Sequence, residues 1–226
     1  MNTPIPNSSN KLTQIKIWVY TSSVIILIFG MMLSWSAVRA KDTVMRAESL
    51  QQAHIVSRTI KAQWIKELSG TEADLGTALY ERLKYQMSLS RETNTHWEWL
   101  YVMGRNANGE IFFYVDSEPD SDEDASPAGQ IYDEATKELI AIFDTGEAIV
   151  EGPVSDSWGL WISPLIPITD PLSNEVIGVF GIDITADTWR KIVWRAAIFP
   201  AANTLLLLIL LFSGYHLITC LLYTSP

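Results

Sequence analysis

Two long apolar runs near the ends of the chain constrain its fold more than any other feature. Residues 17–38 (IWVYTSSVIILIFGMMLSWSAV) carry no charge, and residues 196–220 are uncharged apart from a possible charge on His216. A helix rises about 1.5 Å per residue, so each run is long enough to cross a hydrocarbon core of roughly 30 Å. We therefore predict two transmembrane helices, with interfacial aromatic residues at Trp18, Trp35, Trp189 and Trp194.

Each run has a rival interpretation. The first could be a cleaved signal peptide that ends near Val38-Arg39-Ala40. The apolar part of a signal peptide covers only about 7–15 residues, so we favour an uncleaved anchor. The second run could be a buried globular helix, but helices that are apolar on every face usually lie in lipid.

The charges predict how the chain is divided by a membrane. Every Asp and Glu lies between Asp42 and Asp187. Lys11 and Lys16 favour a cytoplasmic tail at 1–16, although basic residues beside both spans nearly balance this bias. We expect an extracytoplasmic domain at 39–195 in a multi-pass protein of the bacterial inner membrane, which would place the domain in the periplasm if the cell is Gram-negative. Residues 221–226 are expected to be a truncated or artefactual tail, which would make the chain an N-terminal fragment.

Several function classes are disfavoured by composition. The net charge of −10 argues against nucleic-acid binding, which needs a basic face. The single cysteine, Cys220, cannot form an internal disulfide or a multi-thiolate metal site. His54, His96 and His216 have no metal-ligand spacing, and Gly104–Gly109 lacks the strand–helix context of a nucleotide loop. We expect no catalytic residue, metal or cofactor in this chain.

The segment between the apolar runs predicts an α+β domain. Helical periodicity covers 40–68 and, more weakly, 72–90, and a turn at Asn106–Gly109 joins two strand-like segments. A helix is expected within 132–146 with Gly146 as its stop, and three further strands follow. This order predicts a five-stranded antiparallel sheet with helices on its faces, as in a PAS-like domain.

Three segments resemble a known family. SEPDSDEDASPAGQIYDEA, VEGPVSDSWGLWISPLIPI and VIGVFGIDI followed by Trp189 are similar to the extracytoplasmic Cache (PAS-like) sensor domains of bacterial sensor histidine kinases and diguanylate cyclases. The resemblance covers about residues 40–195 and implies a single Cache domain that receives a signal outside the cell. It names no ligand, because such domains bind varied small molecules.

Alternation along the strands predicts which side chains share the ligand-facing side of the sheet. Aromatic and acidic groups converge there, which is typical of a small-molecule pocket. One interpretation is an aromatic cage for a cationic amine with Asp116 or Asp183 as counter-charge. The other is a carboxylate held by Arg105. The predicted ligand-binding residues are Tyr101, Arg105, Tyr114, Asp116, Trp158, Trp161 and Asp183, with Ser163 on the same face. The alternative is that the aromatics are core and the acids are turn or cap residues.

The acidic segment DSEPDSDEDASPAG (116–129) raises the question of calcium. Asp120, Asp122 and Asp124 imitate the first, third and fifth positions of an EF-hand loop, but Ala125 stands at the sixth position, which needs glycine, and Ile131 at the twelfth, which needs glutamate. We therefore interpret the segment as a connector with ordered ends and a solvated middle, and looser cation binding is left open.

Together these features predict the membrane-anchored sensory input region of a bacterial signalling receptor. It would bind a small molecule, act as a homodimer, and signal to an output domain beyond these residues, a histidine kinase first and a diguanylate cyclase second. One rival is a complete two-span interaction or assembly factor without output domain. Another is a metal-responsive sensor that uses the acidic segment.

Overall fold

A computed structural model describes residues 8–119 and 121–224 of the chain. The chain forms two compact units, residues 43–191 and the remainder at both ends. The predicted tail at 1–16 and the tail at 221–226 each lie partly outside the described residues, as does Asp120 of the acidic segment. The predicted domain limits stay predictions.

The unit formed by the two ends of the chain contains two apolar helical stretches. They belong to α1 (Ser8–Ser57) and to α6 (Ile198–Thr224), which follows α5 (Ala186–Trp194) and a short turn, η2 (Arg195–Ala197). Among the described residues, Leu12–Ser57 and Ala186–Leu221 are long and apolar enough to cross a membrane by length and composition. Within this unit Gly30 lies against Thr204, and a side chain at Gly30 would collide with it.

The helix predicted over 40–68 is interrupted, so that prediction was too long. α1 ends at Ser57, and a separate short helix α2 occupies Ala62–Glu67. The hydroxyl groups of Ser57 and Thr59 donate to the carbonyls of His54 and Val56, at 3.0 and 2.7 Å. Such local bonds compete with the helical ladder, and the turn buries Ile60 at 5% exposure. Neither Gly nor Pro is needed for this break.

The second predicted helix begins later than the sequence indicates. A short turn, η1 (Glu72–Asp74), comes first, and α3 runs from Ala78 to Glu92. Thr77 sets the start of α3, because its side chain accepts a hydrogen bond from the backbone N–H of Tyr80.

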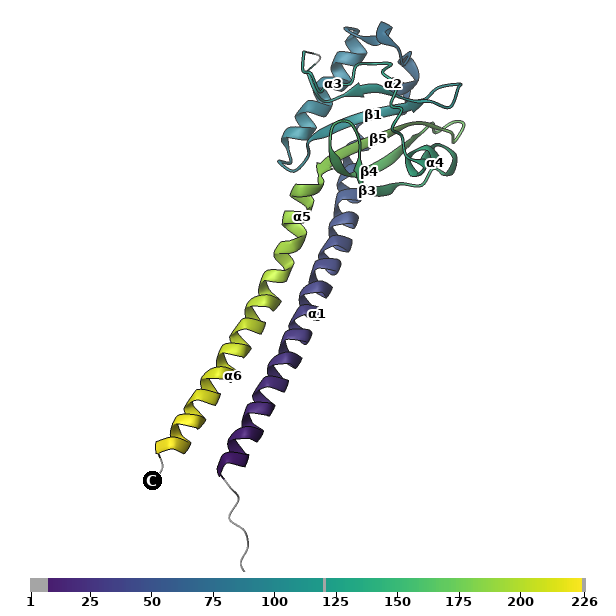
Figure 1. The fold of residues 1–226 in the computed structure, drawn as a ribbon. Coiled ribbons are helices and arrows are strands. Elements are labelled where there is room, and N and C mark those ends of the chain that lie inside the picture. Colours follow the sequence, from purple (N-terminus) through teal and green to yellow (C-terminus); the bar gives the residue numbers. More distant parts are fainter. Residues whose placement is uncertain (1–7, 120, 225–226) are drawn as a thin grey trace, which may run out of the picture. The chain divides into compact units, whose positions relative to one another are not determined.

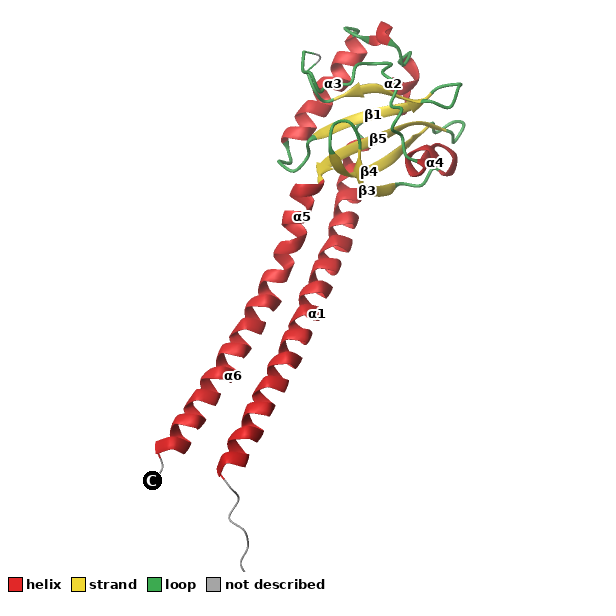
Figure 2. Ribbon diagram, viewed as in Figure 1, coloured by secondary structure: helices red, strands yellow, loops and turns green. Residues whose placement is uncertain are grey.

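The predicted five-stranded antiparallel sheet is confirmed, and Figure 2 shows it as the centre of the domain. Its spatial order is β2-β1-β5-β4-β3, so the last strand lies in the middle between the first and the fourth. This order, with the long helix before it, is the Cache-like, PAS-like α+β architecture that the sequence predicts. The strands are β1 (Trp99–Arg105), β2 (Ile111–Asp116), β3 (Ile149–Ser155), β4 (Leu160–Thr169) and β5 (Val176–Thr185).

A β-bulge in β2 changes which side chains share a face. Tyr101 pairs with Asp116 and Met103 pairs with Phe113, so Tyr114 is the extra residue of β2. An extra residue inverts the alternation beyond it. Asp116 therefore shares a face with Phe113, and not with Tyr114 as simple alternation predicts.

Helices cover the sheet from different sides. Figure 1 shows α3 near β1 and α4 (Lys137–Thr145) beside β4, while α2 packs against β5. Thr136 caps the start of α4, and Gly146 ends it in the left-handed conformation at φ 68°, as the sequence predicts. The core between α4 and the sheet contains Tyr101, Met103, Ile111, Phe113, Leu139, Ile142, Phe143, Leu165 and Val179.

Candidate functional site

A small cavity of about 50 Å³ opens at one end of the α4 face of the sheet. One water needs about 10–15 Å³ on this scale, so the cavity has room for roughly four. Its walls come from all five strands, the connector after β2, the start of α4 and the turn between β3 and β4. Its polar and aromatic lining residues are Trp99, Tyr101, Phe113, Asp116, Asp124, Ser126, Tyr132, Thr136, Glu151, Asp156, Trp158, Trp161, Ser163 and Asp183.

Asp183 is the polar centre of the cavity. It lies on β5 at 8% exposure, and its Oδ1 accepts hydrogen bonds from Tyr101 Oη at 2.9 Å and Ser163 Oγ at 2.6 Å. These donors come from β1 and β4, the two neighbours of β5 in the sheet. The central position of β5 is therefore what brings the three side chains together.

Burial raises the pKa of Asp183 to about 7. The hydrogen bonds from Ser163 and Tyr101 act in the opposite direction, while the negative charges of Asp156 and Glu151 raise the pKa further. Burial and the adjacent Asp183 charge also raise the pKa of Tyr101, so its phenol remains a proton donor. A charged Asp183 is thus poorly compensated by its surroundings, and a cation placed in the cavity would stabilise it.

Glu151 adds a second acidic group. It lies on β3 opposite Ser163, and its carboxylate accepts a hydrogen bond from the hydroxyl of Thr136 at the start of α4. Burial raises the pKa of Glu151; the Thr136 bond opposes this, and the charge of Glu138 adds to it.

Asp156 organises the segment Asp-x-Trp-Gly-x-Trp-x-Ser. Its Oδ1 accepts from the backbone N–H groups of Trp158 and Gly159, each at 3.0 Å, and from Trp161 Nε1 at 2.9 Å. Its Oδ2 accepts from Tyr132 Oη at 3.1 Å. The turn between β3 and β4 thereby fixes the rings of this wall.

Aromatic rings form most of the remaining wall. Trp99 and Trp161 lie 4.6 Å apart between ring centroids, and Tyr132 and Trp158 lie 6.2 Å apart. Phe113 contacts both Tyr132 and Trp158 edge-on or tilted, at 5.8 and 6.4 Å. Ring faces and buried carboxylates are the groups that bind organic ammonium ions.

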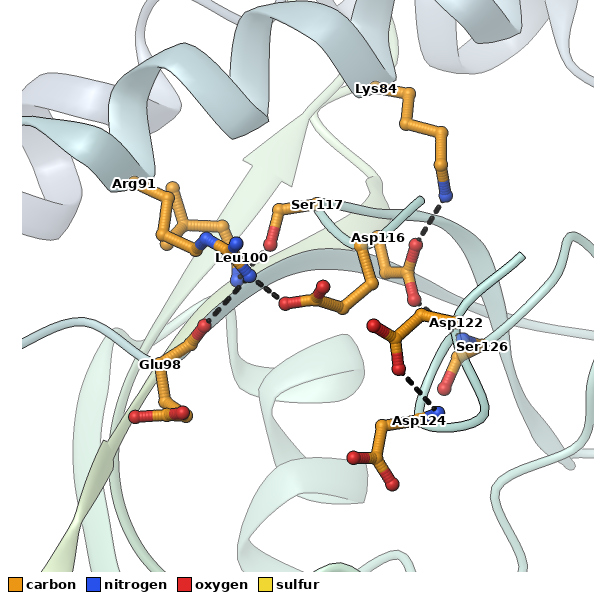
Figure 3. Close-up of polar contacts among 10 residues, drawn as sticks. Lys84, Arg91, Glu98, Leu100, Asp116, Ser117, Asp122, Asp124 and Ser126 are labelled. Atoms are coloured by element: carbon orange, nitrogen blue, oxygen red, sulfur yellow. Dashed lines mark hydrogen bonds and ion pairs between the residues drawn. The ribbon is translucent and has the colours of Figure 1, made fainter. Parts of the chain in front are cut away.

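The acidic connector is ordered at both ends, as Figure 3 shows. Asp116 forms an ion pair of 2.7 Å with Lys84 of α3, and its Oδ2 accepts from the Ser126 backbone N–H at 2.5 Å. Glu118 pairs with Arg91 of the same helix. Asp122, Glu123 and Asp124 are exposed, and the structure agrees with the predicted solvated middle for these three. Within the described residues, no cluster of three or more acidic, His or Cys side chains could hold a metal ion.

Five of the seven predicted site residues meet at the cavity: Tyr101, Asp116, Trp158, Trp161 and Asp183. Tyr114 is outside its lining, because the bulge turns its ring toward Phe112 on the other face, at 4.7 Å between centroids. Arg105 is also outside; it pairs with Asp144 at 2.8 Å and lies over the Phe143 ring. Asp116 lines the cavity, but its carboxylate already pairs with Lys84.

Sequence reasoning did not assign Trp99, Phe113, Tyr132, Glu151 and Asp156 to this site. A signal for Asp156 was present, because it lies in VEGPVSDSWGLWISPLIPI, one of the three segments that resemble the Cache family. The pairing of β3 with β4 would have placed Glu151 beside Ser163. Tyr132 had no comparable pattern, because it reaches the cavity from an irregular segment. Its backbone N–H donates to the Ile111 carbonyl at 2.8 Å, which attaches that segment to β2.

Neither a protein family nor a curated protein matches this chain. Among solved structures, the sensory domain of the Campylobacter jejuni chemoreceptor Tlp3 (CcmL) is similar at 14% identity and a TM-score of 0.43, covering 76% of this chain and 64% of that one. The periplasmic domain of RsbU from Chlamydia trachomatis is similar at 16% identity and a TM-score of 0.34, covering 70% and 56%.

The ligand-binding domain of Tlp3 in complex with L-valine is also similar, at 14% identity and a TM-score of 0.43, covering 79% of this chain and 66% of that one. The chain thus spans less than two thirds of the length of these solved domains. The fold assignment rests on the strand order and register described above.

Proposed function

We propose that this chain is the sensory input region of a bacterial membrane receptor and that its domain binds a small organic ammonium ion outside the membrane. The observation that carries the ligand class is Asp183, a buried carboxylate inside an aromatic cavity. Among the described residues that line this cavity, Asp116, Asp124, Glu151, Asp156 and Asp183 are acidic and none is Lys or Arg.

The charges favour the amine over the carboxylate interpretation. A carboxylate ligand would meet the acidic groups of Glu151, Asp156 and Asp183, and no Lys or Arg lines the cavity. Lys84, which contacts the lining residue Asp116, is already engaged in that ion pair. Arg105, the residue on which the carboxylate alternative depended, points to Asp144 instead. Transfer of an ammonium ion into a buried site is favourable only when it is paired there, and Asp183 supplies that partner.

The membrane part of the proposal rests on the two apolar helices. Each is long enough to span, and they flank the sheet domain in the sequence. We propose inner-membrane anchoring, a homodimeric receptor and an output domain beyond this chain, a histidine kinase first and a diguanylate cyclase second. Sequencing the gene downstream of codon 226 tests the last point, and a stop codon there would instead support the two-span interaction factor.

Ligand binding is tested by thermal unfolding of the full chain in lipid nanodiscs at about pH 8. Methylammonium, ethanolamine and choline should raise the unfolding midpoint, because a ligand that binds only the folded state at 100 times its Kd contributes about 2.7 kcal/mol. Acetate and L-valine serve as anionic and zwitterionic comparisons. A midpoint that rises with acetate or L-valine but with none of the amines would contradict the proposed ligand class.

A further inference from the structure

Arg46 of α1 contacts the edge strand of the sheet, β3. Its guanidinium donates to the Val150 carbonyl at 3.2 Å and to the Gly152 carbonyl at 3.0 Å. β3 is the outermost strand, so alternate carbonyls of this strand point away from the sheet and need another donor. A planar guanidinium can bind two such carbonyls at once.

The two carbonyls flank Glu151, whose side chain lines the cavity. β3 is irregular at this point, because its pairing with β4 shifts between Glu151 and Val154 and Gly152 has φ 101°. A side chain at Gly152 would run into the Trp161 carbonyl. The backbone on both sides of Glu151 is therefore held by one residue of α1 in addition to β4.

The same guanidinium reaches the helix that follows the sheet. Its Cζ lies 5.7 Å from the ring centroid of Trp189 in α5, and Trp189 is buried at 5% exposure. A cation over an indole ring is attracted by the ring quadrupole. Arg46 thus links its own helix α1, which contains the first apolar stretch, to two other elements: β3, which lines the cavity, and α5, which precedes the second apolar stretch.

We propose that Arg46 is the coupling residue of this sensor: it positions Glu151 in the cavity and passes a change at Glu151 to Trp189. This inference rests on the proposed sensory function. A ligand that contacts the carboxylate of Glu151 shifts the backbone at residues 150–152. Because the Arg46 guanidinium is bound to the carbonyls of Val150 and Gly152, it then shifts relative to the Trp189 ring. A ligand transmits a signal along this route only if it binds one of the two arrangements, before or after the shift, more tightly than the other.

The test compares hydrogen exchange of residues 149–155 and 186–194 in the full chain in nanodiscs, without any ligand. Glu151→Ala is the change made in the cavity, in the presence of Arg46 and in the Arg46→Ala background. With Arg46 present, we expect Glu151→Ala to raise exchange at least threefold in both segments. In the Arg46→Ala background, 149–155 should still respond and 186–194 should not.

Two further variants keep the test decisive. Arg58→Ala, an exposed residue just past the end of α1, should leave both responses as in the wild type. Arg46→Lys keeps the charge and the apolar stem but loses the two-point contact, so it should at least halve the response at 186–194 even if Arg46→Ala does not fold. The proposal is overturned if 186–194 respond fully in Arg46→Lys, or do not respond when Arg46 is present.

This outcome is separate from that of the proposed function. Failure of amines to bind would leave the exchange result standing, and a lost exchange coupling would leave amine binding intact.

Discussion

Tyr101 and Asp183 lie 82 positions apart in the chain, and the Tyr101 hydroxyl donates to Asp183 Oδ1 at 2.9 Å inside the cavity. The bond crosses from β1 to β5 and passes beside Gly181, the residue that pairs with Tyr101 in the sheet. Ser163 of β4 donates to the same oxygen. The buried carboxylate is therefore held by both strands that flank its own.

Asp183→Asn should weaken the binding of an organic ammonium ion by about 10- to 100-fold. A hydrogen bond to a charged group contributes about 1.5–3 kcal/mol, and the amide keeps the shape of the side chain without its charge. Isothermal titration with ethanolamine measures the change. Asp144→Asn, at an exposed position outside the cavity, is the matched control and should bind as the wild type does.

Asp183 should make the free energy of unfolding depend on pH. Its pKa is about 7 in the folded state against an ordinary value of 3.8, so the folded state binds this proton more tightly than the unfolded state. Its contribution to stability is fully present below the ordinary value and is lost as the pH rises through about 7. In thermal melts without ligand, the unfolding midpoint of Asp183→Asn, relative to that of the wild type, should therefore increase as the pH rises.

Affinity for the ammonium ion should change with pH in the opposite direction. Only the ionised carboxylate attracts the cation, so the affinity of the wild type should increase as the pH rises through about 7. Titration with choline, whose charge does not depend on pH, measures this without a titrating ligand. An affinity that stays constant between about pH 5 and about pH 8 would count against Asp183 as the counter-charge.

Gly181→Ala should disturb the site from the middle of the sheet. A Cβ there would overlap the Tyr101 ring, which has to move away from Asp183. Overpacking of a buried site costs about 1–3 kcal/mol of stability. We expect a lower unfolding midpoint and weaker amine binding together. Gly214→Ala, where a Cβ would meet nothing within 4 Å, should change neither.

Lys84→Met should destabilise the fold by roughly 3–5 kcal/mol, because it leaves Asp116 buried beside the cavity without its cation. The two side chains are only 10% and 7% exposed. The double variant Lys84→Met/Asp116→Asn should recover part of the loss. Lys137→Met, at an exposed position, is the control. Denaturant unfolding followed by circular dichroism distinguishes the three, and equal losses in the single and double variants would contradict the expectation.

Local patterns were sufficient for most secondary-structure elements. Alternation predicted the strands, the Asn-Gly turn predicted the hairpin, and Gly146 predicted the end of α4, since each depends on residues close in the sequence. The break after Ser57 was missed, because no Gly or Pro marks it and because the burial of Ile60 is a property of the folded domain that no local pattern reveals. Tyr114 was assigned to the wrong face for a related reason: a bulge is a property of the strand pair.

The sequence by itself determined the two apolar stretches, the order of helices and strands, and the presence of aromatic and acidic residues at one end of several strands. Tertiary structure alone decided which of them meet. The middle position of β5 brings Tyr101 and Ser163 to Asp183, the bulge in β2 removes Tyr114, and the pairing of β3 with β4 adds Glu151. These outcomes depend on register between distant segments, and register is fixed by packing across the sheet rather than by any local pattern.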